Sequence, residues 1–322
     1  MLKFLYKRTF FIYEESAYPC MTNQRDFIMK KLSKLIRTCS FFALFTLPVV
    51  ASADETVQKP AELRANFRRI GLELSSTKVS NAKEYENSPV TQLNADNQSL
   101  IKGVFDFVLE YDNADMRWDN SLFMNYGRTK IKGHEEGDVS ETSENEDKIL
   151  LTTDYAYKTW KYRDMDLGPF TSVAYQTEFT RNEDAPRMKV FRGKGGIKLF
   201  SGKIVKEFYV AGVGEYDITY SDNVSKFAAE TGWRLEHKLR DGVQVSTDGY
   251  FRKYFTYSQY VGTDLKYDLN ATARMDVDIT ETLTFGPYIS YRLAQSREAE
   301  SHASNLMIGV SLSYKNLYQL FQ

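Results

Sequence analysis

The sequence contains few of the residues that build metal sites and disulfide frameworks. It has two cysteines and three histidines in 322 residues, which is too few for a zinc cluster or a set of disulfides. Its mean hydropathy is −0.47, and it has no second apolar run close to the roughly 20 residues of a membrane-spanning helix. These absences exclude a polytopic helical membrane protein, and we expect neither a metal nor another cofactor.

An excess of charge of one sign is also missing. The 42 lysines and arginines nearly balance 43 aspartates and glutamates, for a net charge of −1. Nothing resembles a basic face, so we expect no nucleic acid partner. Aromatic residues make up 14% of the chain, which argues against disorder and for a folded protein rich in tyrosine and phenylalanine.

An export signal is predicted at residues 29–53. This segment reads MKKLSKLIRTCSFFALFTLPVVASA, with a basic stretch, an apolar core at 41–50 and small residues at its end. The layout is typical of a secretory signal peptide cleaved between Ala53 and Asp54; the alternative is a signal anchor that stays attached. Residues 1–28 precede a complete signal, so we interpret them as an upstream extension of the gene model. Cleavage would remove both cysteines, and the exported chain would depend on packing or a closed sheet for its stability.

After a polar N-terminal segment at 54–66, the chain alternates between apolar and polar residues with period two, which indicates β-strands. Between 261 and 279, for example, odd positions are largely apolar and even positions are mostly polar or charged. The expected strands are 67–77, 100–111, 116–126, 147–160, 167–179, 190–200, 207–220, 227–238, 243–257, 261–279, 283–293 and 304–314. Such segments exceed the length of about six residues typical of globular strands and are long enough to cross a bilayer at a tilt.

The connections between these strands alternate between short and long. The short ones are 112–114, 163–164, 201–203, 240–242 and 280–282, and the longer ones are 78–97, 129–146, 180–189, 221–226 and 294–303. Only 258–260 is shorter than this alternation requires. A soluble barrel or sandwich also alternates, but long strands and paired connections favour the outer-membrane type. The predicted fold is all-β, an up-and-down antiparallel transmembrane β-barrel of about 12 strands over 67–314, with a C-terminal tail at 315–322.

The last predicted strand carries a further signal. From Gly309 to Tyr314 it reads GVSLSY, which matches the Gly-x-x-apolar-x-aromatic pattern that outer-membrane barrels present to their assembly machinery. We therefore expect the barrel assembly machinery as a partner during insertion, and outer-membrane lipid and lipopolysaccharide as partners afterwards. The expected location is the bacterial outer membrane.

Two neighbouring segments carry a resemblance to a known family. KVFRGKGGIKLFSGKIVKEFYVAGVGEYDITY (189–220) followed by FAAETGWRLEHKLRDGVQVSTDGYFR (227–252) resembles the salt-induced outer-membrane protein family, with its glycine-containing strands and tight periplasmic turns. The resemblance implies an outer-membrane location and a barrel fold, and it assigns no biochemical role.

If the apolar strand faces contact lipid, the opposite faces line the lumen. The charged residues expected there are Lys102, Asp106, Glu110, Arg117, Asp119, Asp154, Lys158, Glu178, Arg192, Lys194, Lys198, Glu207, Glu215, Asp217, Glu230, Arg234, Asp248, Arg252, Asp264, Lys266, Asp268, Arg274, Asp276 and Arg292. Charges of both signs in a narrow interior can pair across it. Two interpretations stay open: a lumen filled by a salt-bridge network, or a narrow water-filled channel for small solutes.

One short motif suggests an enzyme. His302, Ser304 and Asn305 form a His-x-Ser-Asn pattern similar to that of outer-membrane phospholipases and lipid A deacylases, with the histidine as base and the serine as nucleophile. His302 and Ser304 share parity with Leu306, which predicts that they lie on the lipid-facing side near the outer rim. Leu306 stands where those enzymes have a glycine, so we do not expect an enzyme and keep a lipid ester hydrolase as an alternative.

The acidic segment 134–147 (HEEGDVSETSENED) lacks the fixed ligand spacing of a calcium loop and is typical of a solvated surface loop. It suggests a second alternative, a surface-binding protein acting through the long loops 78–97 and 129–146. The main prediction is an outer-membrane barrel that serves as a narrow pore for small solutes or as a structural component of the envelope.

Overall fold

The computed structural model describes residues 60–85, 88, 91–93, 98–131, 141–180 and 186–321, and describes the backbone alone at 91, 98, 128–131 and 141–146. The predicted signal peptide at 29–53, its cleavage site between Ala53 and Asp54 and the upstream segment 1–28 lie outside the described residues. None of the helical segments within the described ranges has the length and hydropathy of a membrane span.

The alternating segments of the sequence form long β-strands. The strands are β1 (Glu62–Ser80), β2 (Gln98–Asp112), β3 (Met116–Ile131), β4 (Glu141–Tyr157), β5 (Trp160–Tyr162), β6 (Met165–Thr177), β7 (Val190–Phe200), β8 (Val205–Asp217), β9 (Val224–Arg240), β10 (Val243–Tyr257), β11 (Leu265–Asp278), β12 (Leu283–Ser296) and β13 (Ala303–Phe321). Two short 3₁₀ helices, η2 (Ala82–Tyr85) and η3 (Thr91–Leu93), lie between β1 and β2.

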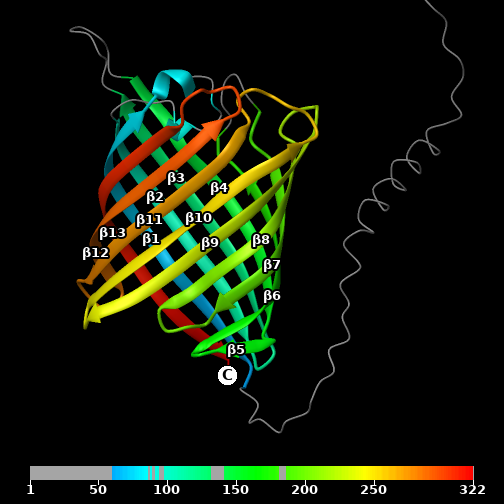
Figure 1. The fold of residues 1–322 in the computed structure, drawn as a ribbon. Helices are drawn as coiled ribbons and strands as arrows, with labels where there is room; N and C mark the ends of the chain where they lie inside the picture. The colour runs from blue at the N-terminus through cyan, green and yellow to red at the C-terminus, as the bar shows by residue number, and fades with distance from the viewer. Residues whose placement is uncertain are drawn as a thin grey trace, which may run out of the picture. The chain divides into compact units, whose positions relative to one another are not determined.

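Twelve of these strands close into a barrel, as the sequence predicts. Each pairs antiparallel with the strand before and after it, and the ring is closed by β1 with β13 and by β4 with β6. The three-residue β5 pairs with β6 and continues the line of β4. Figure 1 shows the strands wrapping around the barrel at a tilt. This order is the up-and-down topology, in which hairpins alone connect the strands.

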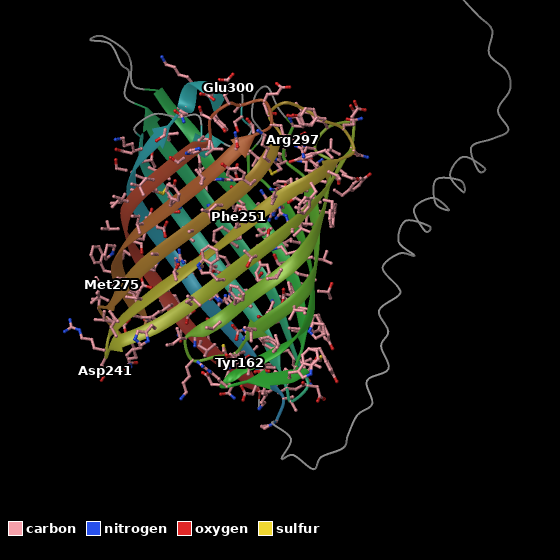
Figure 2. The ribbon with its side chains drawn as sticks, in the orientation of Figure 1. Tyr162, Asp241, Phe251, Met275, Arg297 and Glu300 are labelled. Atoms are coloured by element: carbon pink, nitrogen blue, oxygen red, sulfur yellow. The ribbon has the colours of Figure 1, made fainter. Side chains whose placement is uncertain are left out.

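The two ends of the barrel differ in the length of their connections. The short-turn end has the connections 113–115, 201–204, 241–242 and 279–282, together with 158–164, which is longer because it contains β5. The long-loop end has 81–97, 132–140, 178–189, 218–223, 258–264 and 297–302. Figure 2 shows Tyr162 and Asp241 at the short-turn end and Arg297 and Glu300 at the long-loop end. The start of β1 and the end of β13 also lie at the short-turn end, because the number of strands in the ring is even.

Most predicted connections shift by a few residues in the structure, and three change more. The predicted turn 163–164 lengthens to 158–164, because β4 ends at Tyr157 and β5 lies within the connection. The expected strand at 261–279 begins only at Leu265, because the amide of Asp264 donates to the carbonyl of Val261 at 2.9 Å and closes a turn. The connection is therefore 258–264 rather than 258–260, and the apparent exception to the alternation is removed. β3 and β4 also extend beyond their apolar stretches, so the acidic loop 129–146 shortens to 132–140.

The barrel extends beyond 67–314 at both ends of the chain. β1 begins at Glu62, and residues 315–321, predicted to be a tail, continue β13 and pair with β1. The ring of Phe67 packs against those of Phe107 and Tyr318, with centroids 4.9 and 6.0 Å apart. The N-terminal part of the extension was missed because the alternation of β1 breaks near Phe67, where a β-bulge interrupts the pairing.

The two faces of the barrel are inverted relative to a soluble protein. On β1, Leu72 and Leu74 are 61% and 52% exposed, whereas Glu73 between them is 2% exposed. On β13, Ile308 is 58% exposed and Ser311 is 2% exposed. Apolar side chains outside and polar ones inside are the distribution of a membrane-spanning barrel, so the soluble alternative does not hold.

Candidate functional site in the barrel lumen

A cavity of about 1500 Å³ occupies the lumen. At the short-turn end it is lined by Ser201, Gly202 and Glu281, and at the long-loop end by Thr180 and Thr263. Between these ends its walls are the inward positions of the strands, which are mostly polar or charged. A cavity that reaches the connections at both ends has the geometry of a passage along the barrel.

Most of the charged residues predicted to line the lumen border this cavity. They are Lys102, Asp106, Glu110, Arg117, Glu178, Arg192, Glu207, Glu215, Asp217, Arg234, Asp248, Arg252, Asp264, Asp268, Arg274, Asp276 and Arg292. A second cavity of about 140 Å³ is bordered by Asp119, Asp154, Lys194 and Lys198. Lys158 and Glu230 border neither of these two cavities and are held in ion pairs with Asp112 and Lys194.

Lys266 departs from the predicted pattern. The pairing of β11 with β12 shifts its register between Leu265 and Tyr267, so Lys266 lies at an irregularity in the strand. Leu265 borders the large cavity in its place, and Lys266 borders neither cavity. Parity along a strand predicts the side-chain direction only where the pairing is regular.

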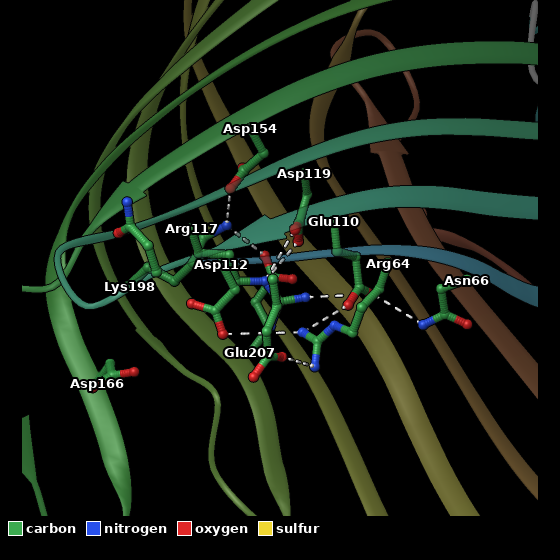
Figure 3. A network of polar contacts seen from close by, with 12 residues as sticks. Arg64, Asn66, Glu110, Asp112, Arg117, Asp119, Asp154, Asp166, Lys198 and Glu207 are labelled. Carbon is green, nitrogen blue, oxygen red and sulfur yellow. Dashed lines mark hydrogen bonds and ion pairs between the residues drawn. The ribbon is translucent and has the colours of Figure 1, made fainter. Parts of the chain in front are cut away.

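Near the short-turn end the buried charges form a network (Figure 3). The carboxylate of Glu110 lies 3.1 Å from Arg64 Nη2 and accepts a hydrogen bond from Asn66 Nδ2 at 2.9 Å. The Nε of Arg117 lies 3.0 Å from both carboxylate oxygens of Asp119. Strands β1, β2 and β3 thus bring their inward charges into contact, which offsets the cost of removing each from water.

The ammonium group of Lys198 on β7 binds carboxylates of β4 and β8. Its Nζ lies 2.5 Å from a carboxylate oxygen of Asp154 and 3.1 Å from one of Glu207. The same Nζ lies 4.5 Å from the ring centre of Phe170, within the range of a cation–π interaction. Lys198 is 4% exposed, so its charge is neutralised almost entirely by protein groups.

Arg252 on β10 joins two buried glutamates. Its guanidinium nitrogens lie 2.6 Å from Glu215 and 2.5 Å from Glu230. Glu230 also accepts hydrogen bonds from Lys194 Nζ at 2.5 Å and from the hydroxyl of Tyr209 at 2.6 Å. Its side chain has no exposed surface, so both oxygens depend on these contacts for hydrogen bonding.

Two further pairs join other strands of the wall. Arg274 Nη2 lies 2.5 Å from Glu73, and its Nη1 donates to the hydroxyl of Ser311 at 2.5 Å. Arg292 binds Asp268 through two parallel hydrogen bonds of 3.0 and 2.9 Å. The salt-bridge network predicted from the sequence therefore exists along the wall, while the large cavity is retained beside it. The two interpretations describe different parts of one lumen.

Acidic groups lie at the mouth of the cavity at the long-loop end. The carboxylate of Asp147 accepts hydrogen bonds from the amides of Phe179 at 2.6 Å and Thr180 at 2.8 Å. The carboxylate of Glu178 accepts one from the amide of Met188 at 3.0 Å. Burial raises the pKa of the Glu178 carboxyl, and the nearby charge of Asp147 raises it further.

The described residues of the connection between β1 and β2 fold inward at the same end. The Tyr85 hydroxyl donates to the carbonyl of Ser301 at 2.7 Å, and Tyr85 is 2% exposed. Gln92 accepts a hydrogen bond from Arg292 Nη1 at 3.1 Å through its side chain and one from Asn305 Nδ2 at 2.6 Å through its carbonyl. We call the described residues of 81–93 the inner loop. The sequence predicted an exterior loop here, and its burial follows from contacts with β12 and β13.

The alternative hydrolase motif does not assemble on one face. His302 is exposed and Ser304 is half-buried, whereas Asn305 is 5% exposed and its side chain turns into the lumen toward Gln92. Consecutive strand residues point to opposite faces, so Asn305 cannot orient His302 on the outer surface. Asn305 therefore does not complete a catalytic unit with His302 and Ser304.

The sequence analysis missed the lumen-lining charges of β1, namely Arg64, Arg68, Arg69 and Glu73, and two of these arginines depend on an irregularity of the strand. The pairing of β1 with β2 and with β13 shifts after Phe67, which places a β-bulge at Arg68. Arg68 and Arg69 consequently both border the large cavity, although neighbours in a regular strand face opposite sides. The available signal was the pair itself, because two consecutive arginines interrupt an otherwise alternating segment.

The fold and the lumen together define the class of the protein, a membrane-spanning β-barrel of twelve strands with an apolar exterior and a polar interior. Residues 92–182 match the model of a family described as a protein of unknown function, DUF3078. This match does not include residues 189–252, so the resemblance to the salt-induced outer-membrane protein family stays a prediction. Among curated proteins, no sequence matches the chain.

Several solved structures are similar to this chain at low sequence identity. An outer membrane channel from Pseudomonas putida F1 is 10% identical, with a TM-score of 0.43, covering 82% of this chain and 100% of the channel. Outer membrane phospholipase A from Escherichia coli is 10% identical, with a TM-score of 0.40 and coverage of 76% and 92%. The translocator domain of autotransporter NalP from Neisseria meningitidis is 9% identical, with a TM-score of 0.33 and coverage of 88% and 97%. The three are a channel, a phospholipase and a translocator domain, and at such scores none assigns a role to this chain.

Proposed function

We propose that this chain is an outer-membrane pore for small hydrophilic solutes. The observation that carries the proposal is the large cavity, which is lined by polar and charged groups and reaches the connections at both ends of the barrel. Much of the wall charge is already paired, so the remaining polar surface is available to water and to solutes. We place the short-turn end in the periplasm and the long-loop end outside, the usual orientation of outer-membrane barrels.

Single-channel recording tests this proposal. The chain without its predicted signal peptide, from Asp54 onward, is refolded and added to a planar lipid bilayer, with heat-modifiable gel mobility as the folding control. We expect discrete conductance steps. A folded protein that produces no steps would contradict the pore and favour a structural role in the envelope.

A pair of cysteine variants tests whether ions pass through the lumen. Both native cysteines lie within the predicted leader and the segment before it, so the chain from Asp54 has none. Ser290 borders the cavity, and its neighbour Ile289 is 43% exposed on the outer face. A bulky water-soluble thiol reagent should reduce the conductance of Ser290→Cys and leave that of Ile289→Cys unchanged. Equal sensitivity of the two variants would show that current does not follow the lumen.

The location is tested separately. Membrane fractionation of expressing cells should recover the protein with the outer membrane, and N-terminal sequencing should begin at Asp54. Recovery from the soluble fraction would contradict the proposed location. Insertion by the barrel assembly machinery and contact with lipopolysaccharide stay predictions of the sequence.

A further inference from the structure

The β-bulge on β1 and the register of four strands bring opposite charges together near the middle of the barrel. Arg69 lies directly opposite Asp106 in the pairing of β1 with β2, and Arg234 lies directly opposite Asp248 in the pairing of β9 with β10. Such cross-strand neighbours usually form ion pairs. In neither of these two arginine–aspartate pairs, all within the described residues, does a guanidinium nitrogen lie within 4.0 Å of the carboxylate. Arg69 instead lies 3.2 Å from Glu73.

Arg234, and Arg68 beside Arg69 in the bulge, make only long contacts with carboxylates. Arg68 Nη2 lies 3.6 Å from Glu110, and Arg234 Nη2 lies 3.5 Å from Glu207. The buried Nε of Arg234 has no hydrogen-bond partner. By comparison, Arg252 lies 2.5 and 2.6 Å from its two glutamates. A guanidinium group has five N–H donors, so Arg68 and Arg234 retain donors that the wall does not use.

These charges face one another across the cavity. Around the ring, β10 and β9 are the fourth and fifth strands from β1, so Asp248 and Arg234 lie on a different wall of the lumen from Arg68 and Arg69. We call Arg68, Arg69, Asp106, Arg234 and Asp248 the arginine–aspartate belt, and all five border the large cavity. The belt thus presents incompletely paired groups of both signs to the lumen, in contrast to the close contacts that Arg252 makes with its two glutamates.

We propose that the belt is a binding station for small zwitterions that carry one carboxylate and one ammonium group, such as simple amino acids. This inference rests on the proposed pore. The carboxylate would accept hydrogen bonds from the guanidinium groups of Arg68 and Arg234, whose planar geometry suits bidentate binding. The ammonium group would lie near the carboxylates of Asp106 and Asp248. A solute of one charge sign is attracted by the belt residues of opposite sign and repelled by the others, and so a dipolar solute is favoured.

Two isomeric solutes of equal size test the inference. Glycine is a zwitterion and glycolamide is its neutral isomer, while glycolate and ethanolamine serve as analogues with one charge. Liposomes containing the refolded chain from Asp54 are placed in isosmotic solutions of each, and their swelling rates are compared. We expect glycine to enter about fivefold faster than glycolamide, the ratio that one weak ion contact provides.

Variants assign this preference to the belt. Arg68→Gln with Arg234→Gln, and separately Asp106→Asn with Asp248→Asn, should each bring the ratio of glycine to glycolamide close to one while glycolamide still enters. Lys238→Gln removes a charge from an exposed side chain at the short-turn end, 67% exposed, and should leave the ratio unchanged. Gel mobility confirms that each variant is folded.

The outcomes separate the belt from the pore. Equal entry of glycine and glycolamide into wild-type liposomes, or faster entry of glycolate or ethanolamine than of glycine, would overturn the zwitterion station and leave the pore intact. A preference for glycine that survives both double substitutions would place the station elsewhere and overturn this assignment. Liposomes that admit none of the solutes would remove the pore, and the inference with it.

Discussion

At the residue scale, the interior depends on paired charges where a soluble protein would depend on apolar packing. Glu230 has no exposed side-chain surface and is held by Arg252, Lys194 and Tyr209. A buried charge is tolerated only when its hydrogen bonds are satisfied, so removing one partner costs more than the pair contributes. The stability of the barrel should therefore be sensitive to single substitutions in its wall.

Arg252→Gln tests this dependence. It leaves Glu215 and Glu230 buried without their shared cation, and we expect the free energy of unfolding to fall by about 3 kcal/mol. Urea titration in lipid vesicles, followed by tryptophan fluorescence, measures the change. Lys238→Gln, on an exposed side chain, is the control and should stay close to wild type. A change below about 1 kcal/mol for Arg252→Gln would mean that water replaces the lost contacts.

The carboxyl of Glu178 predicts a pH dependence of ion selectivity. Burial, together with the charge of Asp147, raises the pKa of Glu178, so this group takes up a proton at a higher pH than an ordinary glutamate. As the pH falls from 7 toward about 5 the mouth loses negative charge, and the preference for cations should decrease. Reversal potentials in a potassium chloride gradient measure this preference. Glu178→Gln should be less cation-selective at pH 7 and show a smaller decrease on acidification; an unchanged decrease would assign it to another group.

At the element scale, two irregular segments control the shape of the lumen. The β-bulge on β1 places Arg68 and Arg69 side by side in the cavity, and the inner loop approaches β1, β4 and β13 at the long-loop end. Regular strands alone would give a lumen of uniform cross-section. The bulge adds charge near its middle, and the inner loop narrows its mouth.

Release of the inner loop should increase conductance. Gln92→Ala together with Asn305→Ala removes two hydrogen bonds between the loop and the wall, each worth about 1 kcal/mol. We expect a larger single-channel conductance than wild type, measured in a planar bilayer. Leu306→Ala, at the next position of β13 on the outer face, is the matched control. If the folded double variant conducts like wild type, the inner loop does not limit the passage.

At the scale of the whole molecule, the inverted distribution of side chains requires an apolar medium around the barrel. Leu72→Arg places a charge at an outward position near the middle of β1, where Leu72 is 61% exposed. An arginine at the bilayer midplane costs about 2–4 kcal/mol, so refolding into lipid should fail or be strongly destabilised. Heat-modifiable mobility after refolding measures the folded fraction. Ser221→Arg, in a connection at the long-loop end, should fold normally; normal folding of Leu72→Arg as well would contradict the membrane-facing surface.

Much of the architecture could be predicted from the sequence, because it depends on local periodicity. A period of two determines which side chains share a face, and therefore the twelve strands and the inward direction of residues such as Glu215 and Asp268 could be predicted. Short polar turns such as Asp241-Gly242, where Gly242 has a φ of +73°, follow from local backbone preferences. Parity also placed His302 and Ser304 on the outer face, apart from Asn305.

Other features could not be predicted, because they depend on contacts between distant parts of the chain. The bulge at Arg68 and the irregularity at Lys266 arise from the register of neighbouring strands. At each, odd and even positions no longer predict which side chains face the lumen. Arg274 meets Glu73 from 201 residues away. Alternation determined the two faces of every regular strand. The closure of the ring determined which inward charges pair and which are left incompletely paired, because only closure brings strands far apart in sequence to opposite sides of one lumen.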